Sequence, residues 1–159
     1  MAKLKTKIFT KDEAHFLKEL LKHKVDFMVI GLAAAALQGA PIVTQDIDLW
    51  FKDLKDPNIK KALKAVGGSY VPPLTMNPPM FAGEKVSLFD IVLTVNGLGS
   101  FSKEKKHILV ISILGAKVPV LKLERIIKSK EAANRPKDKL VLPILKDTLK
   151  TVQRTKNQK

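Results

Sequence analysis

Cysteine is absent from the 159 residues of this chain. Without thiols it forms no disulfide bond and no thiolate-bound zinc or iron–sulfur centre, which agrees with a reducing compartment. The three histidines, His15, His23 and His107, lie far apart in the sequence and have no metal-ligand spacing. No apolar run approaches the roughly 18 residues of a membrane span, and no signal-peptide core follows the Lys-rich start at Met1. We therefore expect a cytoplasmic protein that does not contact a membrane.

Arginine is scarce, although the chain is strongly basic. It has 29 basic and 15 acidic residues, a net charge of +14, and its only arginines are Arg125, Arg135 and Arg154. A basic surface attracts polyanions, so RNA, DNA and nucleotides are natural partners. Lysine-rich surfaces also occur in thermophile proteins, and lysine lacks the planar fork that reads bases. Charge alone therefore leaves solubility or growth temperature open as its cause.

Helical and strand patterns alternate along the first half of the chain. Thr10 and Glu13 have the spacing of a helix capping box, and Gly67-Gly68 interrupts a later helical pattern. In chain order the sequence predicts helix 11–23, strand 27–30, helix 32–38, strand 47–51, helix 57–66, a proline-rich loop 69–80, strand 86–95, strands 107–114 and 117–121, and Lys-rich helices 121–133 and 137–153. This order favours one α/β domain over residues 1–153, followed by a frayed basic tail, 154–159.

The sharpest local motif is Asp46-Ile47-Asp48. Side chains alternate along a strand, so Asp46, Asp48 and Trp50 share one side, while Ile47, Leu49 and Phe51 face the core. Two carboxylates on one side repel each other unless a cation lies between them, and Mg²⁺ prefers one or two carboxylates plus substrate phosphates. A lone motif of this kind is more often a solvated pair at the end of a strand.

Asp90 provides a third acid. It lies within an apolar run, Val86 to Val95, and we expect a central strand there. An ionised carboxylate in such a place must be paired or bind metal. Lys85 or Lys117 can supply a structural partner; alternatively, all three acids converge on a metal cluster that activates a hydroxyl and neutralises a leaving pyrophosphate.

A glycine precedes the acids at the end of the first strand. Gly31 ends strand 27–30 and opens a helix, where backbone N–H groups can face a phosphate. Glycine is also common at such turns for steric reasons alone.

Together these residues resemble the DNA-polymerase-beta-like nucleotidyltransferase superfamily. The matching motif is Val29-Ile30-Gly31-Leu32, a spacer of thirteen residues, then Asp46-Ile47-Asp48-Leu49, with Asp90 as the later acid. The chain is most similar to a small prokaryotic branch that is itself similar to nucleotidyltransferase toxins of abortive-infection toxin–antitoxin systems. The likeness extends to two C-terminal segments, 123–130 and 133–138.

This resemblance implies a nucleotidyltransferase fold, with a mixed β-sheet flanked by helices and further helices at the C-terminus. It also implies transfer of a nucleoside monophosphate from an NTP to a hydroxyl of an RNA (tRNA-like) or protein acceptor, with Mg²⁺ or Mn²⁺ and with an antitoxin as a further partner. Asp46, Asp48 and Asp90 would bind metal, and Asp90 would help deprotonate the acceptor. The positions implied for nucleotide binding are Gly31, Leu32, Thr44 and Lys85.

The chain departs from the family pattern at two positions. Leu32 replaces a second Gly or Ser, and Ile42 replaces an arginine that is frequent in the branch. The alternative hypothesis is therefore a non-catalytic nucleotide- or RNA-binding protein, or a toxin–antitoxin interaction protein, with a degenerate site. Independently of this, the proline-rich loop 69–80 is a lid over the site, an edge that binds a partner, or simply a surface loop.

Further alternatives concern the C-terminal charges and Trp50. Arg125, Lys128, Arg135 and Asp138 either surround the phosphates or only hold the last helices together, with Glu124 and Lys128 as an i, i+4 pair. Trp50 either stacks on a base or packs in the core.

Overall fold

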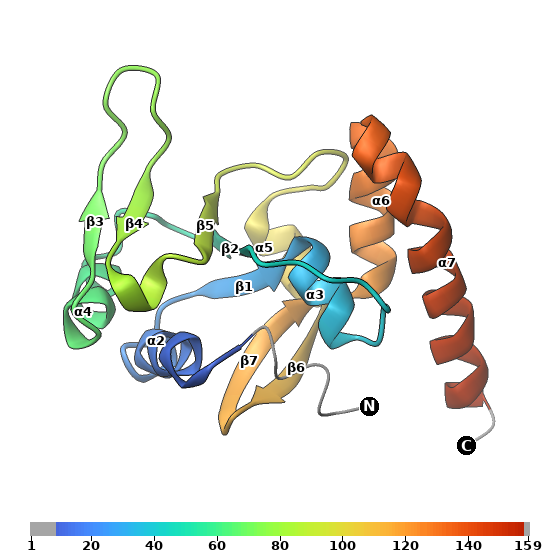
Figure 1. Cartoon of the computed structure of the whole chain (residues 1–159), viewed down its shortest axis with the longest axis horizontal. Coiled ribbons are helices and arrows are strands. Elements are labelled where there is room, and N and C mark those ends of the chain that lie inside the picture. The colour runs from blue at the N-terminus through green and yellow to red at the C-terminus, as the bar shows by residue number, and fades with distance from the viewer. Residues whose placement is uncertain (1–8, 158–159) are drawn as a thin grey trace.

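The computed structural model describes residues 9–157 and is built around one five-stranded sheet (Figure 1). The strand order is β5-β2-β1-β7-β6. Pairs β1–β2 and β6–β7 are antiparallel, whereas β1–β7 and β2–β5 are parallel, so the sheet is mixed. The bounds are β1 Phe27–Ile30, β2 Ile47–Phe51, β5 Phe89–Val92, β6 Ile108–Ile113 and β7 Ala116–Leu121. The predicted α/β class is confirmed.

Helices cover the sheet and extend beyond one end of it. They are α2 Lys11–Lys22, α3 Gly31–Leu37, α4 Pro57–Ala65, the short α5 Phe101–Glu104, α6 Leu123–Ala133 and α7 Pro136–Asn157, with 3-10 turns η1 Glu84–Val86 and η2 Lys105–His107. Helix α2 contacts α4 and β7, α3 contacts β1 and β2, and α6 contacts both α3 and α7. Figure 1 shows α6 and α7 side by side at the end of the molecule opposite the hairpin of β3, Ser69–Val71, and β4, Met80–Ala82.

Local sequence signals explain where several elements begin and end. The capping interaction expected at α2 is present, because the Glu13 carboxylate accepts a hydrogen bond from the backbone N–H of Thr10 at 2.9 Å. Helix α4 has Pro57 as its first residue, and its N-cap Asp56 accepts from the backbone N–H of Asn58. Helix α4 ends at Ala65, shortly before Gly67. The φ of Gly67 is +74°, which is incompatible with a right-handed helix.

The core contains both faces of the central strands. Ile47, Leu49 and Phe51 are buried, as the alternation predicted. Trp50, on the opposite face, is only 4% exposed and meets the ring of Phe101 edge to face at 5.5 Å. Trp50 is therefore a core residue rather than a platform for a base.

Three elements differ from the sequence prediction. Segment 69–80 is not all loop: β3 Ser69–Val71 pairs with β4 Met80–Ala82. The four prolines lie between these strands, since proline cannot take part in the hydrogen-bond ladder. Strand 86–95 is reduced to β5, and α7 continues past residue 153 to Asn157.

The remaining predictions concern the ends of the chain and membranes. The Lys-rich start, and residues 158–159 of the expected tail, lie outside the described residues. Between residues 9 and 157, no helix is both long enough and apolar enough to span a bilayer.

Candidate active site

The fold brings the three predicted acids to one side of the sheet. Asp48 is the second residue of β2 and is in register with Asp90 of β5, and these two strands run parallel. Residues in register on parallel neighbours lie about 4.8 Å apart and point to the same face. Asp46 comes directly before β2. The acids therefore gather where β2 and β5 begin.

The expectation that Asp90 lies in a central strand is wrong. β5 is an edge strand of the sheet and pairs only with β2, so its side chains have a neighbouring strand on one side only. Phe89 is buried, but Asp90 is exposed. Within the described part of the chain neither Lys85 nor Lys117 forms an ion pair with Asp90, so its carboxylate faces solvent beside Asp48.

The three carboxylates influence one another electrostatically. Burial, followed by repulsion from Asp90 and Asp46, raises the pKa of Asp48 from 3.8 to about 6. Burial, then repulsion from Asp46, raises the pKa of Asp90. Shifts of this kind mark a place where negative charge is concentrated and where a cation is stabilised.

The same side chains do not form a closed metal cage. Among residues 9–157, no group of three His, Cys, Asp or Glu side chains is arranged so that it could hold a metal ion by itself. Asp48, which is half-buried and has a raised pKa, lines a pocket, whereas Asp90 is exposed. An ion here would need oxygen ligands from a bound molecule, as is usual for Mg²⁺.

Gly31 closes the site on the side of β1. Its φ is +71°, and a Cβ on this residue would lie 2.6 Å from Oδ2 of Asp48. Any larger residue would collide with the carboxylate and also strain the backbone. The structure shows that a glycine at this position makes room for Asp48; its predicted role in giving a phosphate access to the turn stays a prediction.

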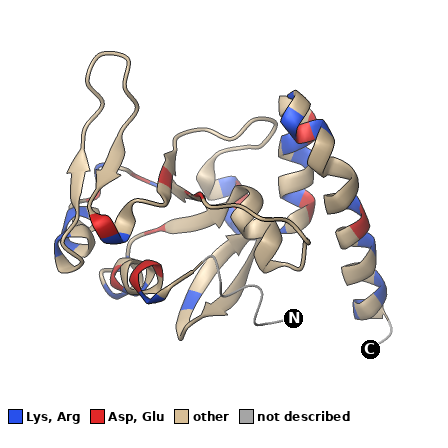
Figure 2. Ribbon diagram, in the orientation of Figure 1, with Lys and Arg blue, Asp and Glu red and all other residues tan. Residues whose placement is uncertain are grey.

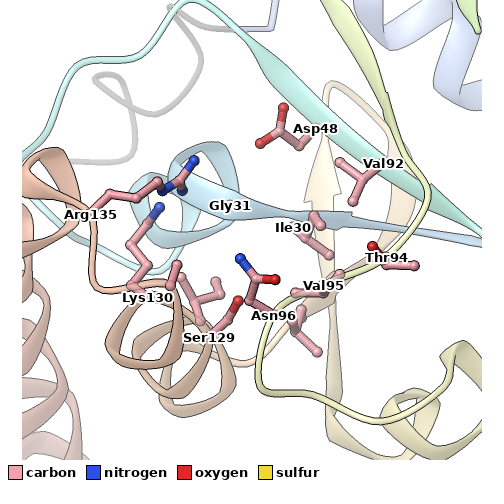
Figure 3. A pocket seen from close by; sticks show the side chains of 13 residues that line it. Ile30, Gly31, Asp48, Val92, Thr94, Val95, Asn96, Ser129, Lys130 and Arg135 are labelled. Carbon is pink, nitrogen blue, oxygen red and sulfur yellow. The ribbon is translucent and has the colours of Figure 1, made fainter. Parts of the chain in front are cut away.

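A cavity of about 250 Å³ opens beside Asp48 and Gly31 (Figure 3). One part of its wall is apolar and includes Ile30, Val92 and Val95. Its polar groups are Asp48, Thr94, Asn96, Ser129, Lys130 and Arg135. The pocket thus lies between Asp48 on the sheet and the C-terminal helices, with charges of both signs in one small space.

The sequence predicts only one of the two basic residues that line this pocket. Arg135, which the sequence offers as a phosphate ligand, lines the pocket together with Lys130, which no sequence motif indicates. Arg125 instead forms a two-point pair with the buried Glu104, at 2.8 and 2.7 Å. The spacing of Glu124 and Lys128 suggested a pair, and none forms in the described residues. Sequence spacing within one helix gives no sign of such partners from other elements.

Three of the residues predicted to bind nucleotide do not line this pocket: Leu32, Thr44 and Lys85. Leu32 is half-buried in α3, and the Thr44 hydroxyl donates to the backbone oxygen of Asp46 at 3.3 Å. Lys85 lies in η1, ahead of β5. Their nucleotide-binding roles stay predictions.

Comparison with solved structures identifies the fold. A crystal structure of ANT(2'')-Ia in complex with adenylyl-2''-tobramycin matches with a TM-score of 0.59 and 15% identity, over 88% of this chain and 90% of that one. A solution structure of the antibiotic-resistance factor ANT(2'')-Ia also matches at a TM-score of 0.59, with 13% identity, over 99% of this chain and 94% of that one.

Sequence comparison adds no assignment. No protein-family model matches the chain, and no curated protein matches it. The likeness to a toxin–antitoxin branch stays a prediction from its motifs. The mixed sheet, its flanking helices and its C-terminal helix pair match the solved neighbours, and the chain therefore has the nucleotidyltransferase fold.

Proposed function

We propose that this protein is a Mg²⁺-dependent nucleotidyltransferase that moves a nucleoside monophosphate from an NTP to an acceptor hydroxyl. The observation that carries the proposal is the parallel register of Asp48 and Asp90, with Asp46 just before β2. These acids lie beside a pocket whose lining also includes basic side chains. The nucleotidyltransferase fold and the matching motif support it.

The donor set fits a magnesium site. Its groups are carboxylate oxygens, which Mg²⁺ or Mn²⁺ prefers. Burial, and then repulsion between the acids, raises the pKa values of Asp48 and Asp90. We assign Asp46, Asp48 and Asp90 as the residues that would hold the ion. A bound divalent ion there would neutralise the charge that develops on the phosphates.

The residues suggest a division of roles. In the proposed reaction the acceptor oxygen bonds to the α-phosphorus, the α–β phosphoanhydride bond breaks and pyrophosphate leaves. Asp90, which is exposed and has a raised pKa, would take the acceptor's proton. Asp48, held against Gly31 inside the pocket, faces the nucleotide side.

The acceptor in this proposal is an RNA or protein hydroxyl. The net charge of +14 supports a polyanionic acceptor such as a tRNA-like RNA. ANT(2'')-Ia was solved with adenylyl-2''-tobramycin, so the test of acceptors includes an aminoglycoside.

The test is transfer of label from each α-labelled NTP to total RNA, lysate protein or tobramycin, with Mg²⁺ or Mn²⁺. We expect label on one acceptor class, lost in Asp48→Asn and Asp90→Asn. The control is Asp53→Asn, an exposed carboxylate just beyond the far end of β2. Transfer that survives Asp48→Asn, or no transfer with any nucleotide, would refute the proposal.

A second candidate is nucleotide or RNA binding without turnover. It is favoured by one observation, namely that the described acids form no closed three-residue metal group. It predicts that NTPs raise the melting temperature equally with and without Mg²⁺. A requirement for metal in that stabilisation would rule it out.

A further inference from the structure

Asp138 is a charged residue in an unusually enclosed position. It is the third residue of α7 and only 1% exposed. Its Oδ2 accepts from the backbone N–H and the Nε of Arg135, at 3.1 and 2.7 Å, and its Oδ1 accepts from Nη2 of Arg135 and Nζ of Lys130, at 3.2 and 3.3 Å. The hydrogen bonds from Arg135 come first among the causes that lower the pKa of Asp138 to about 2. This carboxylate is therefore ionised at neutral pH.

The same contacts fix the turn between α6 and α7. Asn134 ends α6 in the left-handed conformation, with φ of 51°, and Pro136 begins α7. Asp138 then bonds back to the backbone N–H of Arg135, which is the acidic half of a capping box. A purely structural role is therefore available to Asp138, and any further role must produce an effect that a helix cap does not.

The two cations that Asp138 holds point into the pocket. Lys130 and Arg135 both line it, and Figure 3 shows their nitrogen ends side by side, on the Asp48 side of the cavity. Burial and the neighbouring carboxylates raise the pKa of Asp48, and the positive charge of Lys130 offsets part of this rise. Lysines and arginines recur along α6 and α7 (Figure 2), but these two are the ones that line the pocket.

The cluster retains positive charge and free hydrogen-bond donors. Two cations and one carboxylate leave a net charge of one positive unit. Arg135 uses only one edge of its guanidinium, Nε and Nη2, on Asp138. The remaining N–H groups of Arg135, whose side chain is 51% exposed, stay available. A guanidinium fixed in this way loses little entropy when it binds a second anion, and phosphate suits its planar fork.

We propose that Lys130 and Arg135, positioned by the buried Asp138, form the binding site for the phosphate chain of the nucleotide and for the pyrophosphate that leaves. This inference rests on the proposed function, because it places the leaving group of that reaction. It assigns the phosphate contacts to the α6–α7 junction rather than to Leu32 or Lys85, which do not line the pocket. Asp138 is a positioning residue: it touches the two cations and orients them.

The test measures binding of inorganic pyrophosphate by calorimetry, so it requires no turnover. The variants are Arg135→Lys, which keeps the charge but not the fork, Lys130→Gln and Asp138→Asn. Each is expected to weaken pyrophosphate binding by about tenfold or more, because each removes or misaligns a charge-assisted contact. The control is Glu131→Gln, which breaks the exposed α6–α7 pair with Lys146 and should leave binding unchanged.

Melting temperatures separate a structural role from the proposed one. If the Asp138→Asn variant has a lower melting temperature but binds pyrophosphate like the wild type, Asp138 acts only as a helix cap, and the inference is overturned. Arg135→Lys and Lys130→Gln keep the cap, so they remain informative even if Asp138→Asn fails to fold.

Two further arms identify the source of the phosphate and separate this inference from the proposed function. Tripolyphosphate should compete with pyrophosphate, whereas a 5'-hydroxyl RNA oligonucleotide should not; the reverse order would mean an RNA-backbone site and refute the inference. Variant-sensitive pyrophosphate binding without any nucleotidyl transfer would leave the inference standing while the proposed function fails. Nucleotidyl transfer together with unchanged pyrophosphate binding in all three variants would support the proposed function and refute this inference.

Discussion

Replacing Asp48 by asparagine should make the metal-free protein more stable at neutral and alkaline pH. The wild-type carboxylate is buried against Gly31 and repelled by Asp90 and Asp46, which raises its pKa from 3.8 to about 6. Asparagine has nearly the same shape and carries no charge, so it removes the repulsion and leaves the packing in place. The site thus weakens the fold when no cation is bound.

The raised pKa sets the size and the sign of the effect. Two pKa units correspond to about 3 kcal/mol, and screening by water at the pocket mouth reduces this to about 2 kcal/mol. Between pH 4 and pH 6 the native state binds more protons than the unfolded chain, so the stability of the wild type falls as the pH rises through that window. Above it the penalty is constant, and below it wild type and Asp48→Asn should coincide.

Thermal unfolding at pH 4 and pH 8, with EDTA or with Mn²⁺, measures these differences. At pH 8 in EDTA we expect Asp48→Asn to melt roughly 4–8 °C above the wild type, at about 2–4 °C per kcal/mol for a chain of this length. Mn²⁺ at ten times its dissociation constant should stabilise the wild type by about 1.4 kcal/mol and the variant hardly at all. Asp53→Asn, an exposed change, should stay within about 0.5 kcal/mol of the wild type in both buffers.

The reasoning is refuted if Asp48→Asn is less stable than the wild type at pH 8 in EDTA. It is also refuted if the difference persists unchanged at pH 4, because the native carboxylate is then protonated and most of the penalty has disappeared.

Other substitutions test the rest of the structure. Gly31→Ala should cost about 1–3 kcal/mol, because its Cβ would meet the Asp48 carboxylate at 2.6 Å and its φ is positive; urea unfolding measures this, and the cost should shrink in an Asp48→Ala background. Leu145→Ala, at a fully buried position of α7, should cost about 2–5 kcal/mol by the same assay; a loss below 1 kcal/mol would mean that α7 is not anchored there. Glu104→Gln should cost about 3 kcal/mol, because it removes the buried carboxylate that pairs with the half-buried Arg125. Hydrogen bonds from Arg125 lower the pKa of Glu104, so its contribution is present above the unfolded pKa near 4.5 and is lost as pH falls through the folded pKa; a pH-independent difference between wild type and variant would contradict this.

Local chemistry made much of the fold predictable. The capping spacing of Thr10 and Glu13, Pro57 at the start of α4 and Gly67 after its end act within a few residues, and the structure follows them. The Gly31 turn and the acids at positions 46, 48 and 90 were also visible as residue types. Strand 86–95 was overestimated because an apolar run records hydrophobicity but not strand pairing, and β3 and β4 were missed because three-residue strands carry little periodicity.

The sequence by itself determined which chemical groups this protein has: acids alternating on a strand, a glycine before a helix and an excess of lysine. Only the tertiary structure decided which of them meet. β5 pairs in parallel with β2, which sets Asp90 beside Asp48, and the α6–α7 turn brings Lys130 and Arg135 to the same pocket while Arg125 is used by Glu104. Residue type and periodicity are local properties, whereas contacts between distant elements depend on the packing of the whole chain, which no short segment encodes.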